Sequence, residues 1–359
     1  MMDTWLSGAA DSSKASVLVT VALVEGSGPR EAGAKMLVGA SQLWDTIGGG
    51  HLELRAVEVA RGMLADGAAA SRIERFALGP SLGQCCGGVV HLAFERVDGD
   101  LRAVLDALQR RRDQDSWRVS AIDGAPASAL FDAAGNAITC NTNAGADLVL
   151  PSAFVRARAA HVVQDAAGRR WLVDPCLAPR AHLVLFGAGH VGAAIVRVLA
   201  GLPCNVTWVD EREDMFPASV PENVRIEASD TPEALVAQAR PGASYLVMTH
   251  SHALDQRLSE AIMARADVGW FGLIGSQTKR KQFEHRLRAR GADAGRIAAM
   301  VCPIGLPGIA NKAPAAIAIA VCAQLLMVWE AAAASPATAS PATALRLVAS
   351  GASTVIHQF

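Results

Sequence analysis

The sequence lacks the cysteine patterns that bind structural zinc or form disulfide frameworks. Its seven cysteines are scattered and include no C-x-x-C pair. Two of them, Cys85 and Cys86, are neighbours, and α-carbons joined by a trans peptide lie only about 3.8 Å apart, whereas an unstrained disulfide needs roughly 4.4–6.8 Å. We therefore expect a reduced, cytoplasmic protein with neither a disulfide framework nor a closed zinc site.

An excess of positive charge and of tyrosine is also missing. The formal net charge is −1 and Tyr245 is the only tyrosine, whereas nucleic-acid binding proteins usually have a basic surplus and aromatic stacking surfaces. The amino terminus shows no secretory signal, and the one long apolar run, 313–334, contains Gln324 and Glu330. We expect no nucleic-acid partner and no membrane span, and we predict a buried core helix over 314–330.

The remaining patterns predict two folded domains. Residues 1–178 contain short apolar strands and a few helices, which is typical of a mixed α/β domain. In residues 179–330 apolar strands alternate with helices, and this alternation predicts a parallel sheet with right-handed crossovers. The expected fold class is α/β, with a Rossmann-like carboxyl-terminal domain, and the Pro/Ala/Ser/Thr-rich segment 331–359 is expected to be a flexible tail.

The strongest motif is G-A-G-H-V-G, residues 187–192, which follows a strand and begins a helix. In that setting Gly187 permits a tight turn, Gly189 lets a phosphate approach the backbone, and Gly192 lets the helix pack on the strand. Asp210 ends the next strand, where NAD enzymes bind the ribose hydroxyls. The motif predicts a Rossmann fold, but such a loop can hold a nucleotide, another phosphate or nothing.

Two further loops are expected at the same edge of this sheet. His250, His252 and Asp255 follow the fourth apolar strand, and ligands of open α/β sheets bind at the carboxyl ends of the strands. The histidines could bind a metal or polarise a ligand, although one of them or Asp255 could equally cap the next helix. Ser276, after the following strand, is a predicted N-cap of a helix whose free N–H groups suit an anion, and the basic residues after it would add positive charge.

The first domain has two unusual glycine loops, and each has two interpretations. Three successive glycines, including Gly49 and Gly50, precede a helix and predict a tight turn or an anion-binding nest, with Arg30 nearby. Cys85 and Cys86 stand between glycines, including Gly87 and Gly88. Glycine N–H groups can lower the pKa of a thiol from about 8.5, and thiolates bind soft metals. Small buried side chains are the alternative, but we interpret the pair as functional.

Seven motifs in a fixed order resemble the XdhC/CoxI family over about residues 18–330: EGSGPREAGAKMLV, TIGGGHLE, GQCCGG, GAGHVG, THSHALDQ, GLIGSQTKR and CPIGLPGIANKAPAAIAIAVCAQLL. The resemblance implies a protein that holds the molybdenum cofactor, a molybdopterin that carries a phosphate, while a cysteine desulfurase adds a sulfido ligand to the metal. It also implies delivery of that cofactor to apo-xanthine dehydrogenase. Cys86 matches the family's C-G-G turn and is the candidate molybdenum ligand, Cys85 is a variable neighbour, and His190 fits the family but would crowd a dinucleotide.

Other functions remain open at this point. The glycine loop with Asp210 could serve an NAD(P)-dependent oxidoreductase, and relatives of this architecture that attach a nucleotide to the pterin provide a third reading. No H-E-x-x-H occurs in the sequence, and its G-x-S-x-G match, residues 79–83, lies between two predicted strands rather than between a strand and a helix as in a nucleophile elbow. We therefore expect a cofactor-binding chaperone rather than an enzyme, and a homodimer, because a carrier must enclose a large oxygen-sensitive ligand.

Overall fold

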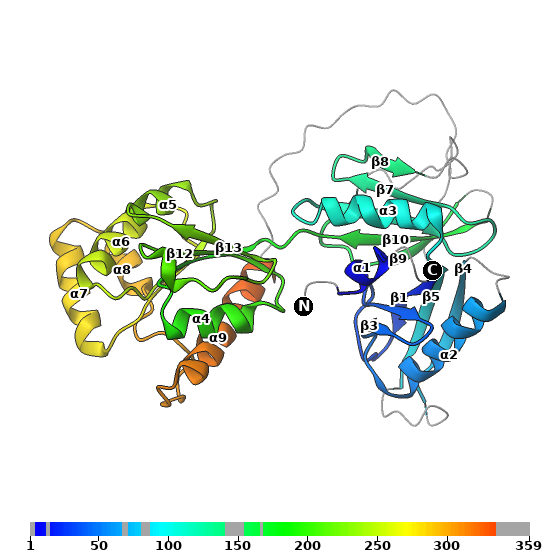
Figure 1. Ribbon diagram of the computed structural model, residues 1–359, viewed down its shortest axis with the longest axis horizontal. Coiled ribbons are helices and arrows are strands. Elements are labelled where there is room, and N and C mark those ends of the chain that lie inside the picture. Colours follow the sequence, from blue (N-terminus) through cyan, green and yellow to red (C-terminus); the bar gives the residue numbers. More distant parts are fainter. Residues whose placement is uncertain are drawn as a thin grey trace. The chain divides into compact units, whose positions relative to one another are not determined.

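The computed structural model describes residues 4–11, 15–66, 71–79, 87–140, 154–165 and 168–334 (Figure 1). The chain divides into two compact units between Ala178 and Pro179. Three five-stranded sheets form these units, two of them antiparallel in the amino-terminal unit and one parallel in the carboxyl-terminal unit. The predicted mixed α/β class with a Rossmann-like carboxyl-terminal sheet is confirmed.

The parallel sheet has the strand order β13-β12-β11-β14-β15, so the chain reverses its direction of travel across the sheet between β11 and β14. A reversal of this kind opens a crevice at the carboxyl ends of the two central strands. The strands are β11 (Ala181–Phe186), β12 (Cys204–Asp210), β13 (Val224–Ala228), β14 (Ser244–Val247) and β15 (Trp270–Leu273).

Helices cover both faces of this sheet, and β11 shows why. Val184 and Phe186 belong to the core under α5, α6, α7 and α8, whereas Leu183 and Leu185 belong to the core under α4 and α9. A strand buried on both faces is a continuous apolar run, which is the pattern of the sequence here. The helical elements are α4 (His190–Leu199), η3 (Glu213–Met215), α5 (Pro232–Gln238), α6 (His252–Ala264), α7 (Gln277–Ala289), α8 (Ala294–Ala299) and α9 (Pro314–Ala334).

Helix α9 is less buried than the sequence predicts. Ala318, Val321 and Leu325 pack into the core, but Ile319 and Met327 remain 59% and 62% exposed. Among the described residues α9 is the one helix that is long and apolar enough to cross a membrane, and only 28% of its most apolar window is buried. The prediction of a buried core helix therefore holds for one face of α9 and is wrong for the other.

A histidine on β11 makes the stability of this unit sensitive to acid. Burial, together with the nearby positive charge of Arg240, lowers the pKa of His182 from 6.5 to about 4, whereas an unfolded histidine keeps an ordinary pKa near 6.5. Between these values the unfolded chain binds more protons, so the free energy of unfolding falls as the pH falls from about 6.5 towards about 4.

We therefore expect His182→Gln to lose less stability than the unaltered protein when the pH is lowered from about 7 to about 5, as measured by urea denaturation midpoints. His285→Gln is the matched control, because His285 is exposed on α7. Equal acid sensitivity in all three proteins would contradict this role of His182.

In its described residues the amino-terminal unit contains two antiparallel sheets and three helices. The first sheet has the order β3-β2-β1-β5-β4 and consists of β1 (Ser16–Glu25), β2 (Lys35–Gly39), β3 (Leu43–Asp45), β4 (Ser71–Ala77) and β5 (Val89–Arg96). The second has the order β8-β7-β6-β10-β9 and consists of β6 (Ser116–Ala121), β7 (Ser128–Asp132), β8 (Ala137–Cys140), β9 (His161–Gln164) and β10 (Arg170–Cys176). The helices are α1 (Thr4–Ala9), α2 (Gly50–Asp66) and α3 (Gly99–Arg110).

Alternate residues of β1 pack on opposite sides of the first sheet. Val17, Val19 and Val21 share a core with α2, whereas Leu18 and Ala22 share cores with residues of the second sheet. Successive side chains of a strand point to opposite faces, so a central strand between a helix and a second sheet must be apolar at every position. In the segment VLVTVALV every residue except the threonine satisfies this requirement.

That threonine lies beside a buried network of charges that joins the two sheets. The side chain of Arg118 on β6 is fully buried; its Nη1 donates to both carboxylate oxygens of Glu95 at 2.8 and 2.7 Å, and its Nε donates to Asp174 at 3.1 Å. Lys35 Nζ donates to the other oxygen of Asp174 at 2.8 Å, and Arg118 Nη2 reaches Thr20 Oγ1 at 3.5 Å. Two cations thus neutralise two carboxylates in the interior.

Candidate functional site

The glycine loop after β11 leaves unused hydrogen-bond donors at the beginning of α4. Gly187 has a φ of +119°, and a Cβ there would lie 2.4 Å from the carbonyl oxygen of Met248, so a larger residue cannot replace it. A Cβ on Gly192 would lie 2.2 Å from the oxygen of Gly187, whereas nothing lies within 4 Å of a Cβ on Gly189. These three glycines therefore stand where the sequence predicts them, with open space beside the second.

The amides of this loop divide into used and unused donors. Gly187 donates to the carbonyl of Val209, and Ala188 donates to Asp210. The N–H groups of residues 189–192 have no partner among the described residues, and Gly189, the N-cap, provides no side-chain cap. His190 is exposed in this first turn. Four amides at the positive end of a helix dipole form a site for a phosphate or another anion.

Asp210 ends β12, as predicted, but its carboxylate already has donors. Its Oδ2 accepts from Ala188 N at 2.7 Å and from Arg212 Nη2 at 3.1 Å, and its Oδ1 accepts from Arg212 N at 3.0 Å and Nε at 2.9 Å. Burial raises the pKa of Asp210, but the bonds from Arg212 and Ala188 outweigh it and leave the pKa below its ordinary value. Asp210 therefore fixes the glycine loop to the end of β12.

The loops after β14 and β15 are joined by a buried ion pair. Asp255 is fully buried and accepts from the N–H of Thr249 at 3.1 Å, from its Oγ1 at 2.7 Å and from Lys279 Nζ at 2.6 Å. Lys279 also donates to the carbonyl of Ile274 at 2.8 Å. The predicted convergence of these loops is confirmed, but Lys279 is neutralised by Asp255 and does not add free positive charge as the sequence suggested.

Serines, and not the histidines or Asp255, cap the helices at this edge. Ser251 accepts from Leu254 N at the start of α6, and Ser276 accepts from Lys279 N at the start of α7, each at 3.3 Å. His250 and His252 are both exposed, so either ring can reach a ligand at the edge.

A small cavity of about 220 Å³ lies beside the glycine loop at the carboxyl ends of β11, β12 and β14. Part of this volume is open to solvent, so the cavity suits one end of a ligand rather than a whole one. The residues that line it are Phe186, Val209, Asp210, Glu211, Pro232, Thr249, His250 and Leu254.

In the amino-terminal unit the structure brings three glycine motifs together. A Cβ on Gly88 would lie 2.3 Å from the carbonyl oxygen of Ser27, and a Cβ on Gly48 would lie 2.6 Å from Pro29. The loop 26–30 therefore lies between the end of the cysteine motif and the triple-glycine loop. Gly87 precedes this contact and is exposed. Cys85 and Cys86 lie outside the described residues, in the connection between β4 and β5.

The triple-glycine loop binds a carboxylate of its own chain. Glu53, in the first turn of α2, accepts from the N–H groups of Ile47 and Gly49 at 3.1 Å each and from Thr46 Oγ1 at 2.5 Å. All three glycines have positive φ, and Gly50 begins α2. The backbone of this loop has the geometry of the predicted anion-binding nest. The carboxylate of Glu53 already occupies that nest, because it accepts from the N–H of Gly49. Arg30 nearby is paired with Glu31 at 2.9 Å.

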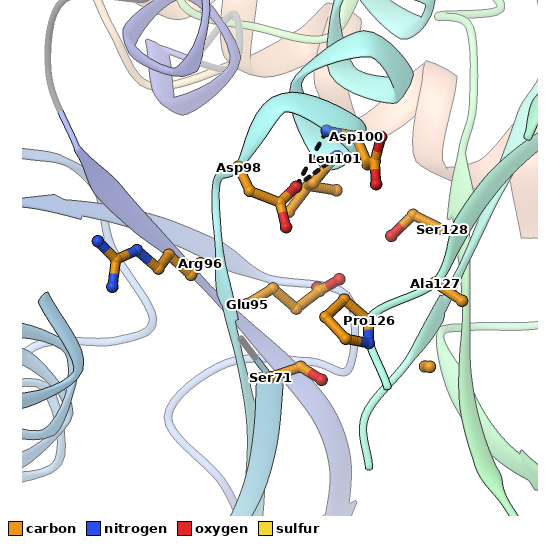
Figure 2. A pocket seen from close by; sticks show the side chains of 10 residues that line it. Ser71, Glu95, Arg96, Asp98, Asp100, Leu101, Pro126, Ala127 and Ser128 are labelled. Atoms are coloured by element: carbon orange, nitrogen blue, oxygen red, sulfur yellow. Dashed lines mark hydrogen bonds between the residues drawn. The ribbon is translucent and has the colours of Figure 1, made fainter. Parts of the chain in front are cut away.

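A second cavity of about 300 Å³ in the same unit has acidic walls but no free acidic cluster (Figure 2). The carboxylate of Glu95 is held by Arg118, and Asp98 accepts from the N–H groups of Asp100 and Leu101 as the N-cap of α3. The Arg96 side chain extends away from the other labelled groups in Figure 2. Among the described residues no three His, Cys, Asp or Glu side chains are placed to hold a metal ion.

The sequence interpretation assigned no role to Thr249 and Arg212, and it recognised Glu53 only as a polar side chain near the triple-glycine loop. Arg212 was detectable, because a basic residue two positions after a strand-end aspartate can fold back onto it. Glu53 follows the glycines at a helix start, where a first-turn acid often accepts from the loop amides. The bond from Thr249 to Asp255 could not be predicted, because the sequence at this point looks the same as that of any capped helix start.

Comparison with known families identifies both units. Residues 183–325 match the model of the XdhC Rossmann domain, and residues 9–77 match that of the XdhC and CoxI family. The chain belongs to the XdhC/CoxI family. The two matches together cover more than half of the XdhC/CoxI chain, and each lies within one of the two units.

Two individual proteins resemble this XdhC/CoxI chain. It is 32% identical over 155 residues to the uncharacterized protein YqeB of Escherichia coli K12; the match covers 42% of this chain and 27% of YqeB. A crystal structure from Bacillus halodurans, described as a xanthine dehydrogenase, superposes with a TM-score of 0.70 and 21% identity over 94% of this chain and 98% of that one. The second likeness shows that the two proteins share a fold.

Proposed function

We propose that the chain is an accessory protein of xanthine dehydrogenase maturation that binds the molybdenum cofactor as cargo and releases it to the apo-enzyme. Membership of the XdhC/CoxI family supports the accessory role, as does the shared fold with a protein described as a xanthine dehydrogenase. The same proposal includes the finer steps. The carrier, a homodimer in the cytoplasm, protects the cofactor while a cysteine desulfurase adds the sulfido ligand, and then delivers it.

The observation that carries the proposal is the set of four unpartnered amides at residues 189–192. Molybdopterin ends in a phosphate, and a helix N-terminus with open space at Gly189 matches its charge and size. His190, His250, His252 and Ser276 lie on loops at the same edge of the sheet and are the proposed further contacts of the cargo. Asp210 and Asp255 support this edge by holding the glycine loop, Thr249 and Lys279 in place.

The amino-terminal unit contains the candidate donor for the metal of the cargo. A thiolate is a soft ligand suited to molybdenum in a sulfur environment, and Cys86, with Cys85 beside it, is the proposed donor. The loop 26–30 with Arg30, the backbone at Gly87 and Gly88, and the nest at Gly49 and Gly50 lie in one region of this unit. Because Glu53 already occupies the nest, the proposed contacts of an anion in this region are the exposed Gly87 backbone and Arg30, which would have to exchange its pairing with Glu31.

The test is to measure which molecules copurify with the protein from cells that synthesise the cofactor. The proposal predicts molybdenum and molybdopterin in equal amounts, and no NAD(H) or NADP(H), in the purified protein. Bound NAD(P) without molybdopterin would instead support an oxidoreductase that uses the glycine loop. Protein from cells unable to make molybdopterin is the control for adventitious molybdenum.

A further inference from the structure

Asp210 has no acceptor capacity left for a ribose. An ionised carboxylate offers about four lone-pair positions, and the four donors to Asp210 are Ala188 N and the N, Nε and Nη2 of Arg212. Three of the four bonds come from Arg212, whose guanidinium binds both oxygens. In NAD-dependent Rossmann enzymes the acid at this position must accept hydrogen bonds from the ribose hydroxyls instead.

We propose that Arg212 closes the ribose-binding corner of this Rossmann unit, so that the glycine loop remains open to a phosphate monoester but nicotinamide dinucleotides are excluded. Arg212 is thus a specificity-determining residue. The proposal rests on the proposed function only for the identity of the phosphate that the loop accepts. A carrier that releases its cargo needs such exclusion, because an abundant dinucleotide would otherwise occupy the same amides.

The bonds of Arg212 block the position of the ribose but leave the phosphate-binding amides available. The Asp210 side chain is 3% exposed and that of Arg212 is 39% exposed, so the guanidinium covers the carboxylate from the solvent side. On the other side, Asp210 is bonded to the amide of Ala188 and cannot turn away. The amides of residues 189–192 take no part in these bonds and have no partner among the described residues, so a phosphate can bind them without breaking the ion pair.

A dinucleotide that carries a 2′-phosphate is excluded by charge. NADP-binding enzymes place an arginine near the ribose to bind that phosphate, but here Arg212 is committed to Asp210 and is followed by acids. Asp214 and Glu211 raise the pKa of Arg212 further above its ordinary value, after the larger effect of the bond to Asp210. With Glu213, the segment 210–214 holds four carboxylates and one guanidinium. A second phosphate would be repelled there.

The test uses NADH as the probe, with protein made in cells that lack molybdopterin so that no cargo competes. Arg212→Ala leaves Asp210 with the two amide donors alone, and its freed positions can accept the ribose hydroxyls. We expect NADH to bind this variant at least about tenfold more tightly than it binds the unaltered protein, in a fluorescence titration. Arg257→Ala, which removes an exposed arginine paired with Glu233, is the control for net charge and should show no gain.

A second variant shows whether any gain comes from Asp210. Arg212→Ala combined with Asp210→Asn should lose the gain, since an amide oxygen is a weaker acceptor for the diol. If Arg212→Ala fails to fold by circular dichroism, Arg212→Lys, which retains one donor, should give an intermediate gain. The proposal is overturned if the unaltered protein binds NADH as tightly as the variant, or if Arg257→Ala gains as much. These outcomes do not depend on whether the purified carrier contains molybdenum.

Discussion

Replacing Cys86 by alanine is expected to weaken binding of the molybdenum cofactor by at least about tenfold, or about 1.4 kcal/mol of binding free energy, and so to lower the molybdenum that copurifies with the chain. The reason is chemical. Thiolates are soft ligands, and glycine N–H groups close to a cysteine can lower the pKa of its thiol. The measurement is elemental mass spectrometry of molybdenum in variant and unaltered protein purified side by side.

Cys85→Ala is the matched control, because it removes a thiol from the adjacent position. The account expects it to retain most of the molybdenum, since Cys86 is the residue that matches the C-G-G turn of the family. If both variants keep their molybdenum, the cysteine pair is a structural feature of the connection between β4 and β5. If Cys85→Ala loses more than Cys86→Ala, the two assignments must be exchanged.

Arg118→Ala is expected to lower the free energy of unfolding of the amino-terminal unit by about 3–5 kcal/mol. Removing the guanidinium leaves Glu95 without its two donors and Asp174 with Lys35 alone, all in the interior between two sheets. Burial lowers the pKa of Arg118, but Glu95 and Asp174 raise it above its ordinary value, so the arginine is charged at any pH at which the protein folds. Amide hydrogen exchange of peptides from β6 and β10 measures the loss.

Arg170→Ala is the control on the neighbouring strand. Arg170 pairs with Asp123, but its side chain is 43% exposed, and exposed ion pairs contribute about 0–1 kcal/mol. The double variant without Glu95 and Arg118 should lose less free energy of unfolding than the sum of the two single variants. The reason is that removing both partners leaves neither of them unpaired by the loss of the other. Equal losses for Arg118→Ala and Arg170→Ala would show that the buried network does not hold the sheets together.

The Rossmann unit could be predicted because its signals are local. The motif 187–192 places three glycines within one turn; close backbone contacts require Gly187 and Gly192, whereas Gly189 has open space beside it. Strand and helix alternation then fixes a parallel sheet. The exposed face of α9 was not predictable, because an alanine-rich apolar helix has the same composition whether one face or both are covered.

The fold of the amino-terminal unit could not be predicted in the same way, because it depends on contacts between residues that are distant in the sequence. Its strand orders follow from pairings such as β1 with β5, more than 60 residues apart in places, which no short-range pattern specifies. Arg118 on the second sheet looks like an ordinary surface position in an alternating strand, yet it is buried because the first sheet brings Glu95 to it. Likewise the sequence shows that Asp255 and Lys279 follow neighbouring strands, but only the fold shows that they neutralise each other.

The measurement that tests the central claim most directly is transfer of the cargo. Purified chain loaded with the molybdenum cofactor is mixed with apo-xanthine dehydrogenase, the two proteins are separated, and molybdenum is measured in each. The account predicts that the dehydrogenase gains the molybdenum that the chain loses, and that it becomes active in proportion. Molybdenum that stays with the chain, while free molybdenum cofactor activates the dehydrogenase equally well, would contradict the account.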